Sequence, residues 1–200
     1  MRSTRATTTH KVLGSLAVIG TATAVAGLGT FGTFTDTTTP VSATLTSGDV
    51  DIDLSQPATR LDTPVTDLVP GDSIARTVTL ENNGTSALSS VSLGVTAGSA
   101  TVLTGDQVNG LQLALTACTV PWTEAAGPTH TCAGNQRAIT TAGAVVGDHA
   151  LDAPASLEPG GADHLLVTLT LPTTAGNAFQ GQSTTLTLTF AGVQRAGTAR

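Results

Sequence analysis

The stretch TTLTLTF, residues 184–190, alternates threonine with large apolar side chains. Leu186, Leu188 and Phe190 fall on one face of an extended chain, because successive side chains of a strand point to opposite faces. Threonine on the other face suits a strand, since branching at Cβ stiffens the side chain and fits a pleated surface. The stretch therefore predicts a β-strand with one buried face.

The same two-residue period recurs along the chain. Further alternating runs lie at residues 48–54, 74–80, 88–95, 111–115 and 165–171, and turn signals lie at 70–72, 82–84, 159–161 and 175–177. Six or more strands without long helical stretches predict an all-β fold, a β-sandwich or barrel. Residues 138–146 fit either a short helix or another strand. LVPGD at 68–72 and LEPGG at 157–161 form a weak repeat, which suggests two hairpin-like halves that face each other.

The N-terminal segment has the pattern of a targeting sequence. Three basic residues, Arg2, Arg5 and Lys11, precede a run without charge that extends from residue 12 to residue 34. The run is long enough for a retained membrane anchor, but glycines interrupt it and no basic stop follows. Small residues flank Phe31, so cleavage between Gly32 and Thr33 is expected. We therefore predict a signal-peptide helix at 1–32 and a single domain at 33–200.

The charge of the exported part narrows the choice of partners. Residues 33–200 hold five arginines and all 14 acidic residues, and 5 − 14 gives a net charge of −9. This sign argues against phosphate contacts with nucleic acid and against an anionic membrane surface. We expect a secreted protein, extracellular or associated with the cell surface, that touches the membrane only through an uncleaved signal segment.

Both cysteines, Cys118 and Cys132, lie in the exported part of the chain. An even count in an oxidising compartment predicts one disulfide, and this spacing is not that of a C-x-x-C redox pair. The loop that they close contains Trp122, the only tryptophan. We expect the loop to pin the end of the strand after Leu115, with the indole packed over the bridge or the rim of the sandwich.

The sequence contains no motif for catalysis or metal binding that we can identify. Histidines His130, His149 and His164 follow no His-Glu-x-x-His pattern, and no Gly-x-Ser-x-Gly is present. The alternating acids of residues 49–53 could collect Ca²⁺, but they fit a solvated strand face better, because no Asp-x-Asp-x-Asp-Gly loop follows. We predict no catalytic residue, no cofactor and no metal site.

Four blocks of sequence, in order, resemble the TasA/camelysin family of secreted bacterial matrix proteins. They are GTFGTFTD at 29–36; SGDVDI at 47–52; LVPGD at 68–72 with ENNG at 81–84; and FQGQS at 179–183 with LTLTF at 186–190. The first block looks like the end of a signal peptide that the dedicated peptidase SipW cuts. The resemblance implies a jelly-roll-like antiparallel β-sandwich.

The resemblance also implies a function. The best-known members assemble into fibres of the biofilm matrix, in which the N-terminal strand of one subunit completes the sheet of the next. In this sequence the donor strand would be residues 34–45, with Phe34, Val41, Ala43 and Leu45 filling pockets and Pro40 bending the segment away from its own domain. The segment could instead fold back as an edge strand and leave a monomer.

Two departures from the family keep other functions open. The Cys118–Cys132 loop is absent from the fibre-forming members, and the chain is shorter than they are. Camelysin-type relatives have been classed as metallopeptidases, although no ligand motif carries over to this chain. A metallopeptidase and a monomeric binding module that uses the disulfide loop therefore remain alternatives to the fibre subunit.

Overall fold

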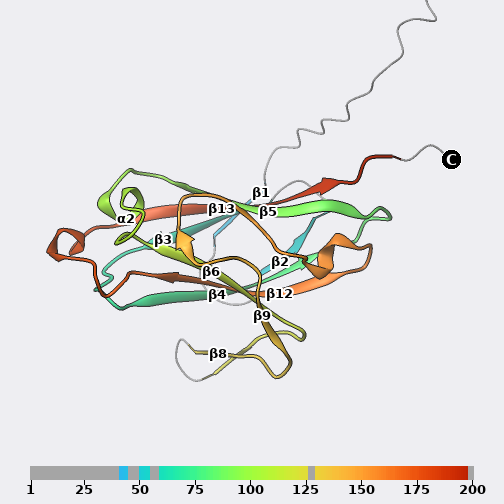
Figure 1. Cartoon of the computed structure of the whole chain (residues 1–200), viewed down its shortest axis with the longest axis horizontal. Coiled ribbons are helices and arrows are strands. Elements are labelled where there is room, and N and C mark those ends of the chain that lie inside the picture. Colours follow the sequence, from blue (N-terminus) through green and yellow to red (C-terminus); the bar gives the residue numbers. More distant parts are fainter. Residues whose placement is uncertain (1–40, 45–49, 55–58, 126–128, 198–200) are drawn as a thin grey trace, which may run out of the picture. The chain divides into compact units, whose positions relative to one another are not determined.

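The computed structural model describes residues 41–44, 50–54, 59–125 and 129–197 (Figure 1). The predicted signal peptide lies outside the described residues, and so do its cleavage site at Gly32 and Thr33 and the donor positions Phe34 and Leu45. No helix in the described part of the chain is long and apolar enough to cross a membrane.

Strands dominate the described chain and form two main sheets. Sheet A has the order β1 (Val41–Thr44), β3 (Thr59–Val65), β13 (Thr184–Gln194), β5 (Leu88–Ala97) and β11 (Gly147–Ala150). Sheet B has the order β10 (Gly143–Ala144), β6 (Gln112–Cys118), β12 (Ala162–Thr170), β4 (Ser73–Glu81) and β2 (Val50–Asp53), and β9 (Gln136–Ala138) also pairs with β6. A third, two-stranded sheet joins β7 (Thr123–Glu124) to β8 (His130–Thr131). Three helical turns complete the described elements: α2 (Val102–Gly105), η1 (Ala155–Leu157) and η2 (Asn177–Phe179).

The alternating side chains form the core, as the sequence predicts. Leu186, Leu188 and Phe190 of β13 are fully buried, while their threonine neighbours face away from the core. The facing positions of β12 and β6 are equally buried, so the inner faces of the two sheets pack on each other as in a β-sandwich. The prediction of an all-β sandwich is confirmed.

The order of the strands differs from two hairpin-like halves. The first strands of the two repeats, β4 and β12, pair with each other in sheet B, and the second strands, β5 and β13, pair in sheet A. Each sheet therefore contains strands from both repeats. The prediction of two facing halves was wrong, because the alternation of apolar residues sets which face is buried and not which strand is the neighbour.

The predicted turns and one ambiguous segment are also defined. Gly71 has φ +99°, a conformation that favours glycine, and its N–H donates to the Leu171 carbonyl at 2.8 Å. This bond ties the turn between β3 and β4 to the end of β12. Residues 138–146 form no helix; the end of β9 and the two residues of β10 run along β6 instead.

Candidate functional site

The side of the sandwich formed by β1, β2, β3 and β4 carries the segment that the sequence assigns to assembly. β1 borders sheet A and β2 borders sheet B, and each pairs in parallel with its neighbour, β3 or β4. The other pairings of the two main sheets in the described chain are antiparallel. Parallel pairing is slightly less stable per residue, so these two short strands are the weakly held borders of the sandwich.

β1 contains two of the predicted donor positions, Val41 and Ala43. Val41 is opposite Thr59 and Ala43 is opposite Leu61 in the register with β3. In the single chain this strand therefore pairs with its own domain, which is the fold-back arrangement that the sequence left open. Pro40, immediately before it, does not turn residues 41–44 away from the sandwich.

Both border strands are shorter than the strands that they cover. β1 ends opposite Asp62, so no described strand lies beyond β3 at residues 63–65. β2 begins opposite Val78, so no described strand lies beyond β4 at residues 73–77. The connection between β3 and β4 is only residues 66–72, which keeps both of these stretches on one side of the sandwich. We call this part, residues 63–65 and 73–77, the open side.

Two polar side chains point inward at the open side. Thr63 lies between the fully buried Leu61 and Val65 on β3, is itself 2% exposed, and its hydroxyl has no hydrogen-bond partner. Arg76 lies on β4 between Ile74, which is partly buried and packs against the core, and the buried Val78. Buried polar atoms are normally hydrogen-bonded, so the Thr63 hydroxyl and the Arg76 Nε are exceptions.

The guanidinium of Arg76 is only partly satisfied. Its Nη1 donates to the carbonyl of Ala75 at 2.8 Å, while its Nε is buried and has no partner. The ion pairs of the described residues are Arg60 with Asp62 and Arg137 with Asp152, and neither involves Arg76. Sequence reasoning placed Arg76 in the alternating run 74–80 but gave it no role, because a single charge within an apolar run carries no signal by itself.

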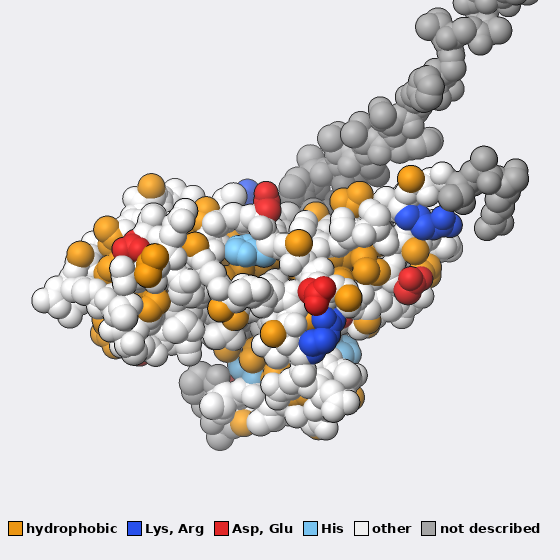
Figure 2. Space-filling view, in the orientation of Figure 1, with side chains coloured by type: hydrophobic (Ala, Val, Ile, Leu, Met, Phe, Trp, Pro, Cys, Tyr) orange, Lys and Arg blue, Asp and Glu red, His pale blue; other side chains and the backbone are white. Residues whose placement is uncertain are grey.

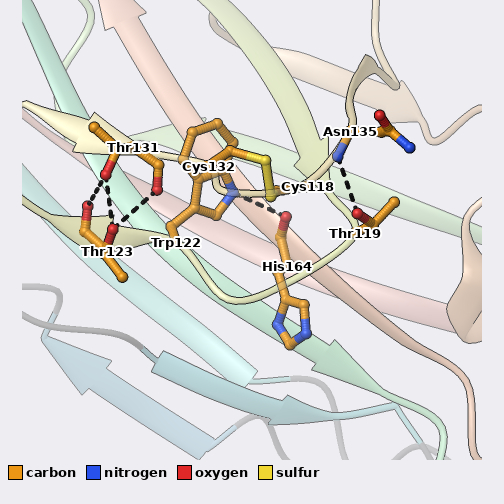
Figure 3. The surroundings of a disulfide bond; sticks show 8 residues. All are labelled: Cys118, Thr119, Trp122, Thr123, Thr131, Cys132, Asn135 and His164. Carbon is orange, nitrogen blue, oxygen red and sulfur yellow. Dashed lines mark hydrogen bonds between the residues drawn. A yellow bond between two sulfur atoms is a disulfide. The ribbon is translucent and has the colours of Figure 1, made fainter.

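The second candidate feature is the disulfide hairpin, residues 118–132. Cys118 and Cys132 are bonded, which confirms the predicted pairing. Cys118 ends β6, so the bridge fixes the end of that strand, and β7 and β8 form the hairpin beyond it. The hydroxyls of Thr123 and Thr131 lie 2.7 Å apart across this hairpin (Figure 3).

Trp122 joins the hairpin to sheet B. Its indole N–H donates to the carbonyl of His164 at 3.0 Å (Figure 3). His164 is the residue of β12 opposite Cys118, so the indole returns to the same rung of the sheet as the disulfide. The covalent bridge and this hydrogen bond together hold the hairpin against the outer face of sheet B.

The three histidines of the described chain contact different parts of the structure. His149 contacts its own loop, with Nε2 3.1 Å from the Val145 carbonyl, and His164 Nδ1 lies 3.3 Å from the hydroxyl of Thr79. His130 belongs to β8 in the disulfide hairpin, and its Nδ1 is buried without a partner. The acids of the described surface are equally scattered, and the face in Figure 2 shows few charged side chains between wide uncharged areas.

Comparison with known protein families assigns the chain to one of them. A family model described as "Camelysin metallo-endopeptidase" matches residues 9–110, about half of the sequence. The chain belongs to the camelysin family. This bears out the resemblance that the four sequence blocks indicated, and it agrees with an extracellular or envelope-associated location.

Two further comparisons, with curated proteins and with solved structures, add no function to this family membership. No match was found among the curated proteins. Among solved structures, the chain is similar to the crystal structure of Aeromonas hydrophila PliG, a periplasmic lysozyme inhibitor of g-type lysozyme, with 11% identity. That alignment covers 77% of this chain and 99% of PliG with a TM-score of 0.31, which is too low to support an argument.

The family description implies a metal, and the described residues do not fit one. No group of three or more His, Cys, Asp or Glu side chains in the described part of this camelysin-family chain could hold a metal ion. A catalytic zinc site needs three protein ligands, two of them commonly histidines on one helix. Here His149 and His164 already contact groups of the sandwich and His130 sits in the hairpin. We therefore derive no metal-dependent step.

Proposed function

We propose that this chain is a secreted structural subunit of an extracellular fibre of the biofilm-matrix type, assembled by exchange of its N-terminal β-strand. The observation that carries the proposal is the position of β1, a four-residue strand in parallel pairing at the border of sheet A. Membership of the camelysin family supports the same function.

The pairing of β1 explains why exchange of this strand between copies costs little free energy. The strand makes backbone hydrogen bonds with β3 in the single chain, and an identical strand from a second copy can make the same bonds. Strand exchange therefore replaces contacts within one chain by equivalent contacts between two chains, as in domain swapping. When each copy gives its strand to the next, the contact does not close on itself, and the product is a filament.

The signal segment determines when exchange becomes possible. Before cleavage, the residues ahead of β1 are continuous with the targeting sequence, whose predicted cut site is between Gly32 and Thr33. After cleavage by a SipW-type peptidase, the new N-terminus begins eight residues before Val41. Export and release of a free N-terminal segment thus precede assembly, which places fibre growth outside the cell.

The alternatives predict different behaviour of the same preparation. A camelysin-type metallopeptidase is favoured by the family description alone, and a monomeric binding module by the exposed disulfide hairpin. Electron microscopy of the purified mature protein, together with its N-terminal sequence, tests the proposal. We expect filaments from a chain that begins at or near Thr33. A monomer at high concentration and at both neutral and acidic pH would refute the fibre, and chelator-sensitive proteolysis by a clean preparation would favour the enzyme.

A further inference from the structure

The border of sheet A opposite to β1 is the strand β11, Gly147–Ala150. The chain around this strand is described without a gap from residue 129 to residue 197, and no described strand lies beyond it. Three of its four residues are exposed, so the connections that lead into and out of β11 leave its outer edge accessible. The edge of an accessible strand can bind another extended chain by main-chain hydrogen bonds.

Two residues of β11 direct their backbone groups away from the sheet. Leu151, the next residue, donates its N–H to the carbonyl of Val91 on β5 at 3.0 Å. Hydrogen-bonded and non-hydrogen-bonded pairs alternate in an antiparallel ladder, so His149 is bonded to β5 while Asp148 and Ala150 are turned outward. The N–H and carbonyl groups of these two residues have no hydrogen-bond partner among the described residues. β11 therefore presents two donors and two acceptors in a row.

The charges along β11 favour a second copy of the same strand in one antiparallel register. A register centred on Asp148 would place two Asp148 carboxylates directly opposite each other. A register centred on Ala150 would place Asp148 opposite Asp152. Like charges in such positions are destabilising. A register centred on His149 places Asp148 of each copy opposite Ala150 of the other, and it pairs all four outward backbone groups of each strand.

The adjacent border of sheet B allows a second copy to come close. Only residues 145 and 146 separate β10 from β11, so the borders of the two sheets lie on the same side of the sandwich. Residues 140–144 at this border have the sequence TTAGA, which contains no charged and no large side chain. The neighbouring charges, Arg137 and Asp152, form an ion pair with each other at 3.6 Å. Neither bulk nor an unpaired charge at this border therefore opposes the approach.

We propose that two copies of the chain associate through β11, in the two-fold antiparallel register centred on His149. The contact continues sheet A from one copy into the next with four main-chain hydrogen bonds. It is isologous and closes with two copies. It also leaves β1 free, because β1 lies at the other border of sheet A.

The size of this contact indicates where it acts. Four residues from each copy bury far less than the roughly 800 Å² per partner of a stable complex, so isolated subunits should pair weakly. Contacts that repeat along two filaments act together and hold more firmly than one alone. In a fibre of the proposed kind, β11 would therefore pair two filaments side by side. The contact itself goes beyond the proposed function and does not depend on it.

A cysteine at the two-fold axis tests the register directly. In His149→Cys, the two introduced side chains would form a non-hydrogen-bonded pair with Cα atoms about 4.5 Å apart, a distance that a disulfide can span. The native cysteines are bonded to each other, so mild oxidation of the mature chain, residues 33–200, should yield a covalent dimer. The matched control is Val146→Cys, whose two copies would lie about 20 Å apart in this register. We expect it to give at least about tenfold less dimer.

An opposite role for β11 makes a different prediction. Short length and a charge such as Asp148 can protect an edge strand from pairing. The variants Ala150→Lys and Ala150→Glu distinguish the two roles, because they add long side chains of opposite charge opposite Asp148 of the second copy. We expect the lysine variant to give about tenfold more covalent dimer than the glutamate variant, both in the His149→Cys background. Equal yields from the two would contradict the register.

Electron microscopy of the mature chain separates the contact from the fibre. Ala150→Pro removes an N–H that faces away from β5, so its own sheet tolerates the change, but the second copy loses a donor. We expect paired filaments from the unmodified chain and single filaments from Ala150→Pro, a comparison that remains decisive if His149→Cys does not fold. Paired filaments in Ala150→Pro, or equal cross-linking of His149→Cys and Val146→Cys, would overturn the contact and leave the proposed function standing. Absence of fibres from the unmodified chain would overturn the proposed function, and cross-linking would still decide the contact.

Discussion

Asp163 shows how one buried carboxylate holds a loop of the sandwich. It is 5% exposed and accepts hydrogen bonds from the backbone N–H groups of Ala155 and Ser156, at 2.9 and 2.8 Å. These N–H groups begin the turn η1, so the side chain fixes that turn to the start of β12. A sequence shows an acid next to His164 but not that the acid faces inward, and this contact could not be predicted from it.

Asp163→Ala should lower the free energy of unfolding by about 2 to 4 kcal/mol, because it leaves the buried N–H of Ser156 and the partly buried N–H of Ala155 without their acceptor. Chemical denaturation measures the change. The exposed Asp67 provides the control, since Asp67→Asn keeps a residue that tolerates its positive φ of 57° and should change stability by less than about 0.5 kcal/mol. Equal effects of the two substitutions would contradict the role of Asp163.

Substitutions of Trp122 test whether its hydrogen bond to the His164 carbonyl attaches the disulfide hairpin to sheet B. Trp122→Phe keeps an aromatic ring but leaves the His164 carbonyl without its indole donor, and we expect a loss of about 1 kcal/mol in the free energy of unfolding. Trp122→Ala removes the packed ring as well and should cost more. Denaturation curves compare the two, and an unchanged midpoint for both would show that the indole does not anchor the hairpin.

At the scale of elements, the sequence predicted strands better than it predicted their neighbours. The run 184–190 lies in β13 and the run 165–171 overlaps β12, because alternation is a local property. β3 was missed, since Thr59–Val65 is short, carries two charges and contains Pro64, which argues against a central strand. The structure accommodates that proline where β1 no longer covers β3, beyond Asp62.

The disulfide hairpin is the element whose stability can be tested separately. Replacing Cys118 and Cys132 with serine removes the cross-link of a loop with a sequence separation of 14 and should cost about 3 kcal/mol. The sheets keep their buried faces in this variant, so circular dichroism should still report strands.

The fluorescence of the only tryptophan reports on the hairpin itself. In the double serine variant, we expect the Trp122 emission to shift toward that of an exposed indole at denaturant concentrations where the strand signal is still intact. The single substitutions are not suitable controls, because each leaves a free thiol that can pair between chains. Reduction of the unmodified chain gives the matched comparison, and it should reproduce the double variant. Coincident loss of both signals without any change in midpoint would contradict the expected contribution.

At the scale of the whole molecule, the sandwich could be predicted and its interleaved order could not. Turn residues and alternation indicate an all-β chain, but β4 pairs with β12 and β5 with β13 over long separations in sequence that no local pattern encodes. The same limit applies to the candidate site. Residues 63 and 76 lie just beyond the described register of β1 with β3 and of β2 with β4, which is a property of the assembled sheets.

A deletion at the N-terminus can separate folding of the domain from assembly of the fibre. Deleting residues 33–40 removes the segment ahead of β1, including Asp36, but retains Val41–Thr44 for pairing with β3 of the same chain. The buried side chains of the described core lie on strands that this deletion leaves intact, so the thermal unfolding midpoint should change little. We expect filaments to be absent by electron microscopy and the chain to sediment as a monomer. A control that lacks residues 196–200 at the other end should assemble normally, since this deletion leaves β13 intact. Filaments formed by the chain without residues 33–40 would show that another part of the molecule joins the subunits, and the exposed disulfide hairpin would then be the first candidate.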